Sequence, residues 1–217
     1  MYYNTRMVFT GLRRAGGIAL AFAGLAVFLW GSWPARQITH EIPYSYGKEL
    51  ALPAGWDGLQ PPPSLADGIF SLQWPAWMRL GDEGKIRLEL SENLPQTDCP
   101  DVENSHPFTI VSRLELPGVV VVPGSELSQL IVPCRPIIQG WSLRPTDGQT
   151  TWGTIWLHLS AAGLPPGSKP QMAVAAVPLV IPVTSLFGLS GAEARLVGVL
   201  AILMGLVLNI DLLVRRR

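Results

Sequence analysis

The histidines are the first side chains of this sequence to test for metal chemistry. His40 and Glu41 begin like the zinc-protease pattern H-E-x-x-H, but Tyr44 stands where the second histidine is required. Two ligands therefore cannot share one helical face. His106 and His158 lie far from each other in the sequence, and a lone histidine is more often a structural or surface residue. We expect no metal site at the histidines.

The acidic cluster of Asp98, Asp101 and Glu103 offers oxygen ligands of the kind that Ca²⁺ prefers. The spacing of an EF-hand and its glycine are absent, so a solvated loop is the favoured interpretation. The sequence also lacks the nucleophile-elbow, phosphate-loop and dinucleotide-binding motifs. We therefore expect no catalytic residue, no cofactor and no metal, and a protein that is not an enzyme.

The two cysteines, Cys99 and Cys134, are a candidate disulfide pair. If they lie outside the cytoplasm, a disulfide between them would persist and would contribute roughly 3–4 kcal/mol in the chain-entropy model. Two unpaired thiols are the alternative. Neither cysteine belongs to a C-x-x-C motif, which argues against redox catalysis.

Composition and charge distribution indicate a membrane protein. The 217 residues are 48% hydrophobic and 15% charged, which is too apolar for a typical soluble domain and excludes intrinsic disorder. Residues 37–190 carry eight Lys and Arg against fourteen Asp and Glu, a balance of −6, and the remaining residues carry +6. A membrane topology produces such a division. The acidic middle also argues against nucleic acid as a partner.

The first candidate span covers residues 15–33, after a basic tail at 1–14. Its nineteen uncharged residues reach roughly 28 Å as a helix, close to the thickness of the hydrocarbon core. Trp30 and Trp33 lie at its end, where indoles favour the headgroup level, and Pro34 stops the helix. A cleaved signal peptide is the alternative. The length of the apolar run and the lack of an A-x-A-like site favour a retained span.

The second candidate span covers residues 191–214, between a linker at 184–190 and an arginine tail at 215–217. Ser190 and Glu193 form the S-x-x-E capping box that opens a helix. Arginines are concentrated on the flanks that adjoin the two termini. Because positive flanks remain in the cytoplasm, we expect both termini there. The domain between the spans is then extracytoplasmic, either periplasmic or at the cell surface, and the lipid bilayer is a partner.

Residues 69–183 are predicted to form one antiparallel β domain. Short apolar and β-branched runs alternate with turn signals, and none has the period of a long amphipathic helix. Residues 85–91 show the pattern best, with Ile86, Leu88 and Leu90 on one face. About seven strands predict a β-sandwich. The preceding stretch, 34–68, is rich in Pro and Gly and is expected to be an irregular connector.

One segment of this domain carries a resemblance. Residues 141–148, WSLRPTDG, and residues 150–159, TTWGTIWLHL, give a strand, a Pro/Asp/Gly turn and a returning strand. On these residues the chain resembles the immunoglobulin-like ectodomains of bacterial membrane-anchored proteins. The resemblance implies an antiparallel immunoglobulin-like β-sandwich and an interaction role, and carries over no functional residues. The expected fold is mainly β and membrane-anchored, with this sandwich between two transmembrane α-helices.

The strand predicted over residues 151–159 is partly apolar on both faces. Trp152, Trp156 and His158 point away from the aliphatic side chains of the same strand. This face is a candidate partner surface, because tryptophan is enriched in interface hot spots. The alternative is a central strand whose second face is covered by the Pro-rich connector.

Small residues recur on the second span at spacings of four, three and four, with an amide beyond them: Ala194, Gly198, Ala201, Gly205 and Asn209. Small residues let helix backbones approach, and an amide can donate a hydrogen bond across the contact. We expect the two spans to pack on each other. Small residues on more than one face of the first span also leave room for a further partner helix.

These features predict a non-catalytic, membrane-anchored interaction module outside the cytoplasm. Its expected role is that of an accessory or structural subunit of a membrane protein complex. The partners would be other membrane subunits or a second copy of the chain. The alternative is an extracytoplasmic domain that binds a small ligand, an ion or a glycan.

Overall fold

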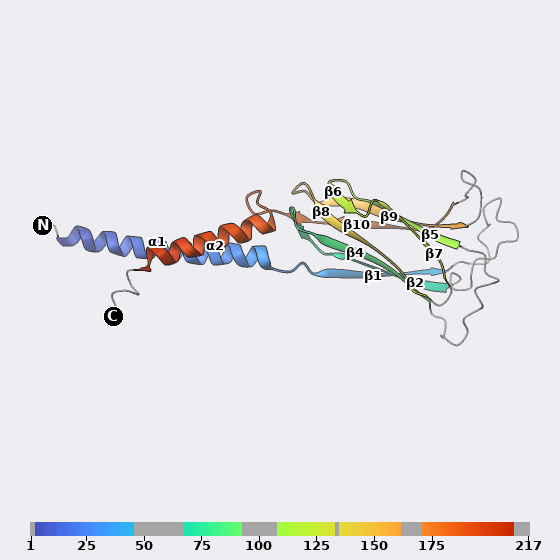
Figure 1. Cartoon of the computed structure of the whole chain (residues 1–217), viewed down its shortest axis with the longest axis horizontal. Helices are drawn as coiled ribbons and strands as arrows, with labels where there is room; N and C mark the ends of the chain where they lie inside the picture. The colour runs from blue at the N-terminus through green and yellow to red at the C-terminus, as the bar shows by residue number, and fades with distance from the viewer. Residues whose placement is uncertain (1–2, 46–66, 93–107, 133–134, 162–170, 211–217) are drawn as a thin grey trace. The chain divides into compact units, whose positions relative to one another are not determined.

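The computed structural model describes residues 3–45, 67–92, 108–132, 135–161 and 171–210. Over these residues the protein is mainly β, with antiparallel sheets and an apolar helix toward each end of the chain (Figure 1). The chain divides into two compact units. The helical unit comprises residues 1–34, 79–82 and 184–217, and the β unit comprises residues 35–78 and 83–183.

The β unit contains two antiparallel sheets. The first has the order β1 (Gln37–Ser45), β2 (Asp67–Pro75), β4 (Gly84–Glu92), β8 (Ile137–Pro145) and β6 (Val119–Val122). The second has the order β10 (Gln171–Ile181), β9 (Thr151–Ala161), β5 (Phe108–Glu115) and β7 (Glu126–Leu130). Two short strands, β3 (Met78–Arg79) and β11 (Val183–Thr184), pair with each other. The prediction of a mainly β, antiparallel domain is confirmed.

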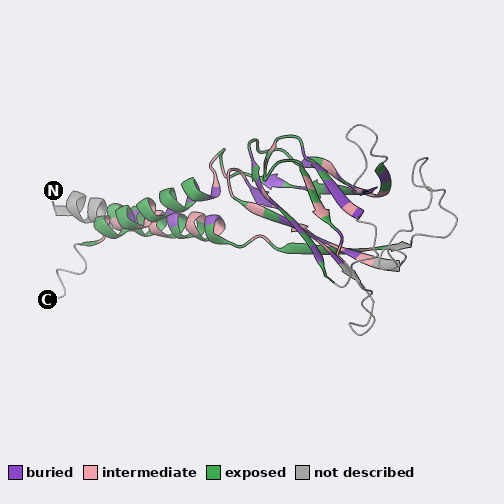
Figure 2. Cartoon of the chain, turned by 45° about the vertical axis from the view of Figure 1, so that its right-hand side comes forward, coloured by how far each residue is buried: buried purple, intermediate pink, exposed green. Residues whose placement is uncertain are grey.

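One apolar core lies between the two larger sheets. In β4 the predicted alternation is confirmed, because Ile86, Leu88 and Leu90 are buried and Arg87 is exposed. Figure 2 shows buried residues alternating with exposed ones along the strands. The largest buried side chain is Trp141 of β8, which is 1% exposed. Local alternation thus decides which side of each strand faces the core.

A polar pair crosses this core. The Ser112 hydroxyl of β5 donates a hydrogen bond to Oε1 of Gln139 in β8, and both side chains are buried. Because β5 and β8 belong to different sheets, this hydrogen bond links the two layers. Nε2 of Gln139 has no hydrogen-bond partner among the residues that the structure describes. The pair is therefore only partly satisfied.

Residues 37–45 correct the expectation of an irregular connector over 34–68. They form β1, which pairs antiparallel with β2 over nine residue pairs. Ile42 lies opposite Phe70 and packs against the core, whereas Ile38 lies opposite Trp74 and is 39% exposed. Pro43 is tolerated because β1 is an edge strand.

The helical unit consists of α1 (Tyr3–Ser32) and α2 (Gly191–Leu208). α1 begins well before residue 15 and ends two residues before Pro34, as expected when a proline disfavours helical backbone at the residue before it. At the start of α2 the expected capping box is present. The Ser190 hydroxyl accepts a hydrogen bond from the Glu193 N–H, and the Glu193 carboxylate accepts one from the Ser190 N–H.

Candidate functional site

The outer face of β9 carries the tryptophans that the sequence singled out. β9 lies between β10 and β5 and is therefore a central strand. Ile155 and Leu157 fill the core from its inner face. On the outer face Trp152 is 69% exposed, Trp156 is 37% exposed and His158 is half-buried. Both indoles can thus contact a partner from a rigid position in the sheet.

The neighbouring strand β10 extends this apolar surface. Val180 lies opposite Trp152, and Pro178 lies opposite Thr154. Both β10 residues are exposed. We call Trp152, Trp156, Pro178 and Val180 the tryptophan face. Two exposed indoles beside aliphatic residues are the composition typical of an interface core.

A polar contact fixes one of the two indoles. Trp156 donates a hydrogen bond from Nε1 to Oε2 of Glu115 at 3.2 Å. Arg113 forms an ion pair with Oε1 of the same carboxylate at 3.0 Å. Both partners lie on β5, next to β9. Because the ring of Trp156 is already oriented, a partner that binds it loses less side-chain entropy.

The alternative interpretation, a connector that covers the tryptophan face, applies to only part of the connector. Residues 37–45 belong to β1, which pairs with β2 in the other sheet, so they do not lie on β9. Residues 46–66 lie outside the described residues. Over the part of the chain that the structure describes, the tryptophan face is open.

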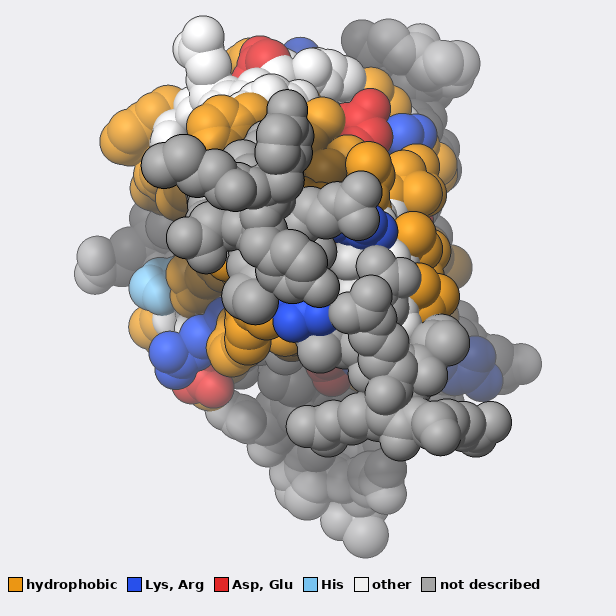
Figure 3. Space-filling model, turned by 90° about the vertical axis from the view of Figure 1, so that its left-hand side faces the viewer, with side chains coloured by type: hydrophobic (Ala, Val, Ile, Leu, Met, Phe, Trp, Pro, Cys, Tyr) orange, Lys and Arg blue, Asp and Glu red, His pale blue; other side chains and the backbone are white. Residues whose placement is uncertain are grey.

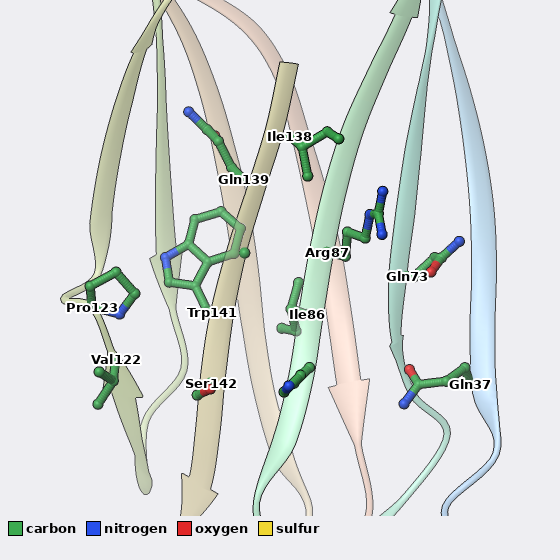
Figure 4. Close-up of a pocket in the computed structure, with 12 residues that line it drawn as sticks. Gln37, Gln73, Ile86, Arg87, Val122, Pro123, Ile138, Gln139, Trp141 and Ser142 are labelled. Carbon is green, nitrogen blue, oxygen red and sulfur yellow. The ribbon is translucent and has the colours of Figure 1, made fainter. Parts of the chain in front are cut away.

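A shallow depression of about 530 Å³ lies on the outer face of the other sheet (Figure 4). Gly140, which has no side chain, lies opposite Arg87, and Ser142 lies opposite Lys85. Both cationic residues therefore line the depression beside Gly140. Arg87 also forms an ion pair with Glu89 at 3.0 Å. Cations beside a hydroxyl suit a small polar or anionic ligand.

The two helices pack along a seam of glycines. A Cβ on Gly24 would come within 2.7 Å of the Gly198 carbonyl oxygen, and a Cβ on Gly198 would come equally close to that of Gly24. Gly17 and Gly205 make the same reciprocal contact. A Cβ on Gly31 would lie 3.0 Å from the Gly191 carbonyl oxygen, whereas a Cβ on Gly191 would meet the Asp82 carboxylate. Backbones approach this closely only where side chains are absent. These three pairs run in opposite chain directions and define an antiparallel register.

The small residues predicted for helix packing lie along this seam. Ala194, Gly198 and Gly205 are buried, and Ala201 is half-buried. The side-chain amide of Asn209 was expected to donate a hydrogen bond to the other helix, and the structure differs. Its Nδ2 donates to the Gly205 carbonyl oxygen of its own helix at 2.8 Å, rather than across the contact.

Gly17 and Gly24 belong to the small residues expected on the first span, but Gly31 and Gly191 were not predicted to pack. Glycines recur every seven residues on both helices, at 17, 24 and 31 and at 191, 198 and 205. A spacing of seven keeps residues on one side of two packed helices. The shared spacing was therefore the signal that would have identified Gly31 and Gly191 as packing residues.

Away from the seam, both helices present apolar surface. The segments Arg13–Ser32 and Gly191–Leu208 are long and apolar enough to cross a membrane. The exposed apolar residues include Ile18, Phe22, Leu25 and Leu29 on α1, and Leu196, Leu200, Leu203 and Val207 on α2. On the face that Figure 3 shows, the coloured side chains are largely hydrophobic, with charged ones scattered among them.

Arg79, the last residue of β3, and Asp82 in the turn after it contact the adjoining ends of the two helices. Arg79 is 5% exposed and donates a hydrogen bond to the carbonyl oxygen of Trp33, just beyond α1. It also forms an ion pair with Asp82 at 3.3 Å. The Asp82 carboxylate lies against Gly191, the first residue of α2. A cation at a helix C-terminus and an anion at a helix N-terminus both complement the helix dipole.

The remaining candidate ligands do not converge within the described ranges. No group of three or more His, Cys, Asp or Glu residues there could hold a metal ion. His40 packs edge-on against the Trp74 ring at a centroid distance of 6.3 Å. Cys99, Cys134 and the acidic cluster beside Cys99 lie outside the described residues, so the disulfide stays a prediction.

Comparison with known proteins adds no family to this description. A scan against protein-family models and a search of curated proteins both found no match for this chain. The description of the chain therefore rests on its architecture. Two helices that are apolar enough to cross a membrane flank a mainly β domain.

Proposed function

We propose that this protein is a two-pass membrane protein whose extracytoplasmic β domain is a non-catalytic interaction module. In this role it is an accessory or structural subunit, and the tryptophan face binds another membrane subunit or a second copy of the chain. The single observation that carries the proposal is the exposure of Trp152 and Trp156 on a central strand. Such positions are preferred for interface hot spots.

The strand order supports an immunoglobulin-like sandwich for this module. In constant-type immunoglobulin domains the sheets have the orders A-B-E-D and C-F-G. With β2 as strand A, the series β2-β4-β8-β6 follows A-B-E-D, and β10-β9-β5 follows G-F-C. β1 and β7 are then additional edge strands. A domain of this kind presents rigid sheet faces to partners.

The charge distribution supports the topology of the proposal. Arginines adjoin the spans on the side of the termini, at positions 6, 13, 14 and 215–217. The positive-inside rule then places both termini in the cytoplasm. The antiparallel packing of α1 and α2 brings their opposite ends to the same side, as a two-pass chain requires.

The proposal is tested by purifying the full chain with a C-terminal tag from native membranes in a mild detergent. We expect an intact complex of stoichiometric membrane proteins, or a defined multiple of the chain mass. Replacing Trp152 and Trp156 with alanine should reduce the recovered partner at least about tenfold, because hot-spot truncation costs at least 2 kcal/mol.

The matched control replaces Val120 and Ile138, which are exposed on the other sheet, with alanine. This variant should retain the complex. A lone chain at monomer mass, or equal retention by both double variants, would contradict the proposal.

The depression beside Gly140 favours a second candidate function, the binding of a small polar or anionic ligand by the β domain. Two border cations, Lys85 and Arg87, would then carry the recognition. A ligand from a panel of acidic glycans and organic anions should raise the melting temperature of the full chain. Lys85→Gln should weaken that shift, and no shift with any panel member would exclude this function for the panel.

A further inference from the structure

The turn before α2 presents an aromatic ring to solvent. Phe187 is 95% exposed. Its φ of +52° lies in the left-handed region, which is unfavourable for residues other than glycine and asparagine. Gly188 follows with φ of +80°, and the Leu189 N–H donates to the Leu186 carbonyl oxygen at 3.0 Å. The two left-handed residues are the central pair of the turn that this hydrogen bond closes. The turn therefore accounts for the backbone, and it leaves the apolar ring of Phe187 available for a contact outside the chain.

The turn lies at one particular end of the helix pair. Phe187 precedes the N-cap residue Ser190 by three positions. Gly31 lies against Gly191, so the end of α1 is beside the start of α2. Trp33, the residue after α1, is 67% exposed at this same end. Phe187 and Trp33 are therefore two exposed aromatic residues where both candidate spans meet their boundary.

The surroundings of the turn suit lipid. No residue from 183 to 192 is charged. In the adjoining turn Arg79 pairs with Asp82, and the next residue, Glu83, is exposed. In the first turn of α2 the Glu193 carboxylate accepts a hydrogen bond from the Ser190 N–H. The exposed apolar faces of both helices begin directly beyond this end. Entry of the turn segment 183–192 into the headgroup region would carry no charge with it, and aromatic rings are favoured at that level.

We propose that Phe187 inserts into the outer surface of the bilayer, at the boundary between headgroups and acyl chains. The inference rests on the proposed two-pass topology, because only then does this end of the helix pair lie at the outer surface. The ring anchors the start of α2 at a fixed depth, and the left-handed backbone directs it away from the helix pair. The occupant of this surface is lipid, not a protein.

The test places the photo-crosslinking residue p-benzoylphenylalanine at position 187 of the full chain. The protein is reconstituted in nanodiscs of phosphatidylcholine and phosphatidylglycerol, irradiated and analysed by intact mass. Position 200, where Leu200 is 57% exposed in the middle of α2, serves as the reference for the membrane span. Position 120 of β6, where Val120 is 50% exposed, serves as the reference for the β domain.

We expect lipid adducts at 187 and 200, with a yield at 187 about tenfold above that at 120, as for an interfacial apolar anchor. Adducts at 200 without adducts at 187 would overturn this inference and leave the proposed topology intact. The absence of lipid adducts at both positions would overturn the topology as well. When the experiment is repeated in native membranes, a protein adduct at 187 in place of lipid would overturn the assignment of lipid as the occupant.

Discussion

Burial decides what an arginine contributes to the stability of this protein. Arg79 and Asp82 form an ion pair at 3.3 Å, and their side chains are 6% and 24% exposed. Arg87 and Glu89 form an ion pair at 3.0 Å, and their side chains are 51% and 35% exposed. The distances are similar, but solvent screens the second pair. Arg79 also lies over the Trp30 ring, at 5.2 Å from its centroid, and so combines packing with charge.

Arg79→Met should lower the free energy of unfolding by about 3 kcal/mol, because it leaves the Asp82 charge without its partner. Arg87→Met should cost less than about 1 kcal/mol, because its pair is exposed. Unfolding of the full chain in mixed detergent micelles, followed by circular dichroism, measures both. Equal losses for the two variants would contradict the distinction by burial.

The buried pair of Ser112 and Gln139 gives a second test at this scale. Ser112→Ala should destabilise the full chain by about 1–3 kcal/mol, because Oε1 of Gln139 loses its donor in the core. The double variant with Gln139→Met should recover most of this loss, because it also removes the buried Nε2. Denaturant titration of the single and double variants measures the recovery. A double variant that is less stable than the single one would refute the explanation.

At the scale of elements, the glycine seam sets how α1 and α2 pack. The three pairs at 17/205, 24/198 and 31/191 are related by the same antiparallel register. A shift by one residue would bring a side chain against a backbone at each of them. The seam therefore specifies both proximity and register.

Gly24→Ala should weaken the helix pair by about 1–3 kcal/mol, because the new Cβ would lie 2.7–2.8 Å from atoms of α2 that include backbone. Gly16→Ala is the matched control, since a Cβ there meets nothing within 4 Å. The control should be neutral or gain up to about 1 kcal/mol from helix propensity. Detergent-denaturant titration of each full-chain variant measures the difference, and equal stability of the two variants would argue against the seam.

At the scale of the whole molecule, the chain combines a helical unit and a β unit that are each compact. The strands between α1 and α2 connect two helices of opposite direction. If the helices span a membrane as proposed, all of the β unit lies on one side of it. The charge balance of −6 between the spans suits the outer side.

Protease added outside intact spheroplasts should cleave the β unit and leave tags at both termini protected. The physical reason is the positive-inside rule, by which the arginine-rich flanks of the proposed spans favour the cytoplasmic side. Immunoblotting against each tag measures the result, and permeabilised cells serve as the control. Digestion of either tag in intact spheroplasts would contradict the proposed orientation.

Local patterns in the sequence were enough to predict several features of the fold. The capping box at Ser190 follows from four adjacent residues, and the burial of Ile86, Leu88 and Leu90 follows from alternation. The apolar segments at both ends follow from composition. Each of these features depends on the preferences of neighbouring residues, which the sequence displays directly.

Only the tertiary structure decided which elements meet. The sequence indicated that Trp152 and Trp156 share a face, but their exposure depends on strands and segments distant in the chain. It did not indicate that residues 37–45 would join a sheet beside β2, because strand pairing is a long-range contact. The register of the glycine seam was equally hidden. Periodicity tells which side of an element is apolar or small, whereas packing of the whole chain determines what covers that side.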